Sequence, residues 1–336
     1  MPDRTYCTIA ELVADLRQPA GPEPDEATLM RAIRHASDFI DRRLGQFIPE
    51  TATRWFDGNG ERDLFIDPCL AVTAVTDDGD AITATQYRLY PLNRHWASGP
   101  YTRLGIDEDA TELGYWTHQR RAVSVAGRWG KYEESIATGA TTTQADGATT
   151  SLLASSGANI SPGAVLLVES EQELVEATGA ATDSTANCEE ITASDDNFIC
   201  SDGALVNVGE VLKVEFEQMK LLDKAGNRLY VARQWNGTKR AAHSTGLDIY
   251  VYRTFTVKRG VNGTTAASHS AKAISRYIPP YDVGSLCIML AALQRKMADT
   301  NYAGRAGNAE LGEAFYYKMF PKEIDEIRRN YRITSL

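Results

Sequence analysis

The stretch RQWNGTKRAAHS at residues 233–244 recurs as RGVNGTTAASHS at residues 259–270, 26 positions further along the chain. An arginine, the triplet Asn-Gly-Thr, an alanine and a closing His-Ser occupy the same places in both copies. Such an internal repeat indicates a repeated structural unit, and Asn-Gly favours a tight turn with positive φ. The repeat therefore predicts two similar strand-turn-strand units packed side by side.

The two histidines of the repeat, His243 and His269, could alternatively be metal ligands or catalytic bases. Neither has a cysteine or a carboxylate at ligand spacing in the sequence, and such sites need these neighbours. We therefore favour a structural role for the repeat. A nearby group of glutamates is expected to form an exposed charged face and not an acid–base pair: Glu169, Glu171, Glu173 and Glu176.

Strand-like sequence surrounds the repeat. Short strands are expected from 164 to 280, preceded at 137–163 by an Ala-, Thr-, Ser- and Gly-rich segment typical of a linker or the start of an inserted module. Alternating sequence from 47 to 132 predicts a small antiparallel domain, in which 54–56 and 63–66 pair as a hairpin across the turn 57–60. The acidic stretch 77–80 lacks EF-hand spacing and is expected to be a solvated turn.

Helical patterns lie at both ends of the chain. Thr8 and Glu11 form a capping box that predicts a helix over about 9–17, and an apolar stripe predicts a second over about 26–44. Further helices are expected at about 283–297 and 311–331. These patterns predict an α+β fold, with a helical domain built from 1–46 and 281–336, a first antiparallel β-module at 47–136 and an inserted β-module at 137–280 that contains the repeat.

Composition sets further limits. The 336 residues allow about two domains, and 43% hydrophobic with 24% charged residues is a globular composition. No run of sequence is long and apolar enough for a membrane-spanning helix, and the start of the chain lacks the pattern of a secretory signal. Five scattered cysteines fit reduced thiols and a cytosolic origin, with Cys188 and Cys200 the only pair close in sequence.

The net charge of −10, from 35 basic and 45 acidic residues, argues against a surface that binds nucleic acid throughout. Nucleotide-binding loops, metalloprotease motifs and nucleophile elbows are absent from the sequence. We expect no catalysis, no metal and no cofactor.

Several segments, in their order along the chain, resemble the head-to-tail connector family of tailed bacteriophages, also called adaptor or head-completion proteins. They are YCTIAEL at 6–12, ASDFID at 36–41 before Gly45 and Pro49, TRWFDG at 53–58, YRLYP at 87–91, GRWG at 127–130 and RGVNGT at 259–264. The resemblance covers about 1–132 and 255–331, and the segment from about 137 to 254 is additional to the compact members of the family.

The resemblance implies a structural virion protein that assembles in the host cytoplasm as a ring, usually of twelve subunits, at the head-to-tail interface. Its partners would be the portal protein, a downstream stopper or tail protein, and genomic DNA that passes through the channel without sequence specificity, with no membrane involved. By position, the portal-binding residues would be Arg328, Arg329, Tyr331, Arg332, Ile333 and Leu336.

Other interpretations stay open at this point. Lys239 and Arg240 could contact DNA or a neighbouring acidic subunit, although we favour simple solvent exposure as their explanation. The acidic charge suits a channel along which DNA slides, and it also suits ordinary solubility. The alternative function is that of a capsid decoration, baseplate or tail protein with repeated β-modules.

Overall fold

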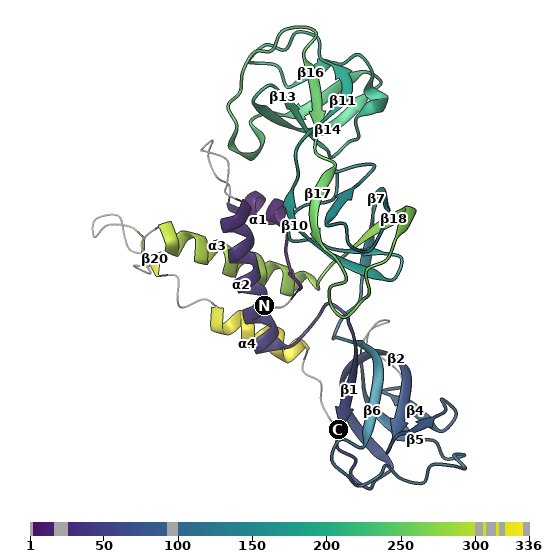
Figure 1. Cartoon of the computed structure of the whole chain (residues 1–336). Coiled ribbons are helices and arrows are strands. Elements are labelled where there is room, and N and C mark those ends of the chain that lie inside the picture. Colours follow the sequence, from purple (N-terminus) through teal and green to yellow (C-terminus); the bar gives the residue numbers. More distant parts are fainter. Residues whose placement is uncertain are drawn as a thin grey trace.

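Three six-stranded antiparallel sheets and a group of helices form the chain in the computed structural model (Figure 1). The model describes residues 3–16, 26–92, 100–299, 305–306, 314–315 and 320–331. In Figure 1 the three sheets follow one another along the length of the molecule, and the helices lie beside the middle one. The expected α+β class is wrong, because strands dominate the described residues and the fold is β-rich.

The first sheet, called sheet A, has the strand order β1-β6-β2-β5-β4, with β3 paired to β2. Its strands are β1 (Glu50–Phe56), β2 (Asp63–Asp77), β3 (Asp80–Ile82), β4 (Tyr87–Tyr90), β5 (Tyr101–Ile106) and β6 (Val123–Trp129). The expected hairpin between 54–56 and 63–66 is wrong, because β6 lies between β1 and β2. The amides of Gly58 and Gly60 donate instead to the carbonyls of Gln119 and Trp116.

The acidic stretch 77–80 is the β2–β3 turn, with positive φ at Asp78 and Gly79. The turn itself is confirmed, but it is only partly solvated. Asp77 is buried, and its Oδ2 accepts hydrogen bonds from the amide and the hydroxyl of Thr117.

Residues 137–280, expected to form one β-module, contain most of one sheet and all of another. Sheet B has the order β7-β18-β9-β10-β17-β8, and sheet C has the order β11-β16-β13-β14-β15-β12. The strands of sheet B are β7 (Ser135–Gln144), β8 (Ser151–Leu153), β9 (Val165–Val168), β10 (Glu171–Thr178), β17 (Thr254–Lys258) and β18 (His269–Tyr277). Those of sheet C are β11 (Thr182–Asn187), β12 (Asn197–Ile199), β13 (Val211–Val214), β14 (Glu217–Ala225), β15 (Arg228–Ala232) and β16 (Asp248–Val251).

The two sheets have the same topology, so residues 135–178 with 254–277 form one copy of a module and 182–251 form a second. Beyond the repeat quoted above, VLLVESEQ at 165–172 matches VLKVEFEQ at 211–218 in all but two positions. The second copy, module C, is inserted between β10 and β17 of the first, module B, at the place where module C has only the short turn 226–227. The repeated units therefore lie in two separate sheets and are not packed side by side in one.

The helices are α1 (Ile9–Leu16), α2 (Glu26–Leu44), α3 (Tyr281–Asp299) and α4 (Phe320–Asn330), with short strands β19 (Arg305–Ala306) and β20 (Ala314–Phe315). The capping box before α1 is confirmed: the Glu11 amide donates to Thr8 Oγ1 at 3.3 Å, and the Thr8 amide donates to Glu11 Oε2 at 2.9 Å. The expected last helix begins later than predicted, at Phe320, and part of its range lies outside the described residues. No helix of the described chain is long and apolar enough to cross a membrane.

The helices from both chain ends share a core with module B, and we call these four helices the helical body. Leu12, Leu29, Ile33 and Leu286 from the helices belong to one buried cluster with Val165, Leu174 and Val261 of module B. Sheet B is therefore buried on both faces, because its other face has a core of its own that includes Leu166, Val168 and Val175.

Candidate functional site

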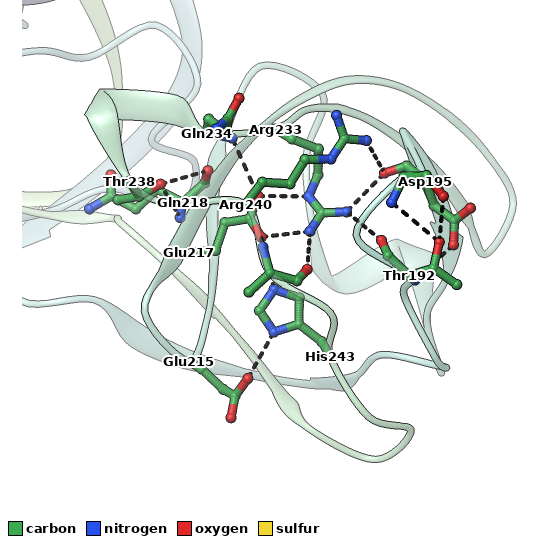
Figure 2. A network of polar contacts seen from close by, with 12 residues as sticks. Thr192, Asp195, Glu215, Glu217, Gln218, Arg233, Gln234, Thr238, Arg240 and His243 are labelled. Atoms are coloured by element: carbon green, nitrogen blue, oxygen red, sulfur yellow. Dashed lines mark hydrogen bonds and ion pairs between the residues drawn. The ribbon is translucent and has the colours of Figure 1, made fainter. Parts of the chain in front are cut away.

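The repeated residues of module C meet in a buried polar network around Glu217 (Figure 2). Arg233 binds this carboxylate with two hydrogen bonds, from Nε to Oε1 at 2.7 Å and from Nη2 to Oε2 at 2.6 Å. His243 Nε2 lies 3.0 Å from Glu217 Oε2, and its Nδ1 lies 2.9 Å from Glu215 Oε2. The side chains of Glu217 and Arg233 are 0% and 1% exposed. The site is thus a buried ion pair with a histidine held between two carboxylates.

Module B contains the same network with equivalent residues. Arg259 donates to Glu171 from Nε at 3.0 Å and from Nη2 at 2.6 Å. His269 lies 2.9 Å from Glu171 through Nε2 and 2.9 Å from Glu169 through Nδ1. Sequence spacing alone does not reveal this pairing, because the carboxylates lie far from the histidines along the chain. The sequence feature that indicates it is a second repeat, Glu-x-Glu-Gln, at 169–172 and 215–218.

The remaining identical residues of the repeat connect the same two segments in each module. Asn236 Nδ2 donates to Gln218 Oε1 at 2.7 Å, and the Gln218 amide donates to Thr238 Oγ1 at 3.0 Å. In module B, Asn262 and Gln172 form the corresponding bond at 2.8 Å. Both asparagines have positive φ, near 52°, a conformation that asparagine tolerates better than most residues. The repeated sequence is therefore explained by cross-bracing between a tight hairpin and the loop beside it.

The hydrogen bonds keep both central glutamates ionised. Burial alone would raise the pKa of Glu217, but the bonds from Arg233, His243 and the Ala241 amide outweigh it and lower this pKa to about 2. The same balance between burial and Arg259 lowers the pKa of Glu171. Each histidine faces a carboxylate through both ring nitrogens.

Glu171, Glu173 and His269 form the one group of described residues whose side-chain oxygen and nitrogen atoms lie close enough to hold a metal, within 4.8 Å of one another. The surroundings do not suit a metal cation, because the guanidinium of Arg259 lies between the two carboxylates, 3.2 Å from Glu173 Oε1. Burial raises the pKa of Glu173, which favours its neutral form. Module C keeps the rest of the network with Met219 at the equivalent position. We therefore interpret the group as structural bracing.

The expectation that these glutamates form an exposed face is wrong for two of them. Glu171 and Glu173 are buried, whereas the side chains of Glu169 and Glu176 are 44% and 36% exposed. The charge of Glu171 is compensated by Arg259, which lies far along the chain.

The other predicted site residues lie apart from these networks. Lys239 is exposed, and Arg240 is bonded within module C to Asp196 Oδ1 at 2.7 Å. Arg328 and Arg329 are exposed on α4. Tyr331 is partly buried: its ring packs edge-on against Phe47, with 5.1 Å between centroids, and its hydroxyl donates to Asp282 at 2.9 Å. Arg332, Ile333 and Leu336 lie outside the described residues.

Several segments that carry the connector resemblance meet at one joint. The Tyr6 hydroxyl donates to Asp41 and accepts a hydrogen bond from the Phe47 amide, while the Tyr6 amide donates to Ser37 Oγ at 3.1 Å. At the same joint, the carbonyl of Asn262 accepts a hydrogen bond from the Thr51 amide at 2.9 Å. The joint thus connects the helical body, the start of sheet A and the repeat loop of module B.

A cavity of about 450 Å³ lies at the junction of modules B and C. Hydroxyl groups line much of it, including those of Ser155 and Ser184, and Asp183 and Arg253 are its charged lining residues. Arg253 is already bonded to the buried carboxylate of Glu210, at 2.7 and 2.9 Å. Glu210 also accepts a hydrogen bond from the Gly157 amide of module B at 3.1 Å, so the ion pair takes part in the contact between the two modules and Arg253 is not free to bind a ligand.

Comparisons with protein-family models, with curated proteins and with solved structures found no match.

Proposed function

We propose that the protein is a head-to-tail connector of a tailed bacteriophage, a ring-forming adaptor beneath the portal protein through which genomic DNA passes. A stopper or tail protein would bind on its other side. The role is structural, and its natural locations are the assembled virion and, during assembly, the host cytoplasm.

The observation that carries the proposal is the joint described above. The connector-like segments at 6–12, 36–41 and 259–264 are far apart in the sequence, yet Tyr6, Asp41 and Asn262 all take part in it, and Arg4 bonds both Asp41 at 2.9 Å and Asn262 at 3.3 Å. Residues that occur together in a family and also meet in space are expected to preserve a common architecture.

Two further properties support a structural role. The central carboxylates of the two networks, Glu217 and Glu171, are buried and accept hydrogen bonds from an arginine, a histidine and an amide, so neither is available to a substrate. The net charge of −10 keeps a DNA phosphate backbone from binding tightly to the chain as a whole.

The test is co-sedimentation of the 36.9 kDa chain with a purified portal ring. We expect the portal peak to shift by a fixed number of subunits. Alanine substitution of both Arg328 and Arg329, which are exposed on α4, should weaken the shift, whereas Lys239→Ala on distant module C is the matched control. Absence of co-sedimentation at every salt concentration would refute the portal-binding role.

The duplication of the β-module favours a second candidate, a capsid decoration, baseplate or tail protein with repeated modules. Binding to purified capsids or tails, with no binding to the portal ring, would distinguish this role from that of a connector.

A further inference from the structure

The two copies of the module differ most clearly on one face of the sheet. In module B, the side chains of β9 and β10 that point away from the module's own core are Val165, Leu167, Leu174 and Glu176. Val165 and Leu174 are buried in the core shared with the helical body, and Leu167 packs against it. Glu176 pairs with Arg34 of α2 at 2.5 Å. The outward face of sheet B is thus covered by helices.

The same positions in module C are Val211, Lys213, Lys220 and Leu222, which we call the outward face of module C. They alternate with Leu212, Val214, Met219 and Leu221, which are fully buried in the module's own core. Leu222 is 58% exposed, and Val211, Lys213 and Lys220 are half-buried. No described part of the chain covers this face as the helical body covers its counterpart.

Apolar groups extend this face at its margins. Val208 is 45% exposed, whereas its counterpart Pro162 lies at the joint with α1, where its carbonyl accepts a hydrogen bond from the Ile9 amide at 2.9 Å. Trp235 is half-buried and stands where module B has Val261, a residue of the shared core. A soluble sheet face normally carries polar side chains, so apolar residues at these positions indicate a covered surface.

We propose that the outward face of module C packs against a second copy of this chain. Lys213 and Lys220 replace Leu167 and Leu174, so the partner should be acidic, and a second copy of this chain, whose net charge is −10, complements the two lysines in charge. In module B, the corresponding face packs against the helical body of the same chain. Contact between this face and a different surface of the next copy is heterologous, and repeated contacts of this kind form a ring when the rotation between successive copies closes.

The inference rests on the ring assembly of the proposed function, and its test is independent of the portal. Sedimentation velocity of the full chain across a wide concentration range, at low and at high salt, measures self-association. We expect Leu222→Glu, which introduces the residue found at the equivalent position of module B, and Lys220→Glu each to weaken self-association about tenfold. Higher salt should weaken it in the wild-type chain.

Leu153→Glu is the matched control, because Leu153 is 57% exposed and lies on β8 of module B, away from the face. Amide hydrogen exchange over 211–222 verifies that each variant keeps sheet C folded. A wild-type chain that stays monomeric at all concentrations overturns the inference, and so does self-association that both face variants leave unchanged. In either case portal co-sedimentation still decides the connector role separately.

Discussion

Replacing Glu217 by glutamine should destabilise module C and increase its local unfolding. The substitution keeps the shape of the side chain but removes the charge that compensates Arg233, whose side chain is 1% exposed. It also turns one oxygen into an NH₂ group among donors from Arg233, His243 and the Ala241 amide. An unpaired buried charge costs about 3–5 kcal/mol.

The pKa of Glu217 gives an independent magnitude. A value lowered from 4.5 to about 2 corresponds to about 3 kcal/mol of stabilisation, at ~1.4 kcal/mol per unit of pKa. Because the folded-state pKa is the lower one, this stabilisation is present above about pH 4.5 and is lost as the pH falls towards about 2. In Glu217→Gln this acid-dependent loss should be absent, because glutamine has no carboxyl group to protonate and the variant is already destabilised at neutral pH.

Hydrogen exchange by mass spectrometry measures the change within the intact chain. At neutral pH we expect protection of the peptides covering β13 to β16 to fall roughly 150-fold, which corresponds to ~3 kcal/mol in the opening equilibrium, while sheet A is unaffected. Glu215→Gln is the control, because this carboxylate is 47% exposed and bonds the same His243, so its loss should cost less than about 1 kcal/mol. Equal effects of the two substitutions would refute the reasoning.

Three further predictions follow from local structure. Thr8→Ala removes the side-chain cap of α1 and should cost about 1 kcal/mol, seen as faster exchange of α1 amides, with no change in module C. Replacing 180–253, which contains module C, by a Gly-Asn turn copied from 226–227 should leave module B folded, because the Gly179 amide already donates to the Thr254 carbonyl at 2.8 Å. Loss of cooperative thermal unfolding in this variant would contradict the prediction. Tyr331→Phe removes the hydrogen bond to Asp282 and should destabilise α4 by about 1 kcal/mol, measured by exchange of α4 amides, whereas Tyr331→Ala, which also removes the ring packing, should cost more.

Features decided by neighbouring residues could be predicted from the sequence. The capping box of Thr8 and Glu11 involves atoms three residues apart, and α1 and α2 begin and end close to their expected positions. The failed hairpin shows the limit of local reasoning. The 57–60 turn is locally suitable, yet β6, some 60 residues further on, pairs with both flanking strands. Strand pairing is decided by such distant contacts, which alternation alone does not specify.

The buried glutamates were missed for a related reason. A charged residue is exposed in most proteins unless a partner compensates it, and the partner of Glu171 is Arg259, 88 positions away. The sequence does contain both halves of the network twice, but the copies are nested. The first halves are 46 positions apart and the second halves 26, because module C lies inside module B. A search for one fixed period therefore finds only one half of the repeat.

Comparing the two nested modules distinguishes the residues that maintain their common fold from the residues that differ with the surroundings of each module. The bracing residues are identical in both copies, and each makes the same bonds, so they maintain the hairpin and the loop wherever the module stands. The outward face is not maintained in this way. In module B this face is apolar, with a glutamate paired to α2, and helices cover it. In module C, where no described helix covers it, the face carries two lysines and the exposed Leu222. Since the two copies share one architecture, we attribute the difference to what each face contacts. The face of module B contacts the helices of its own chain, and the outward face of module C is the surface we propose to contact a second copy.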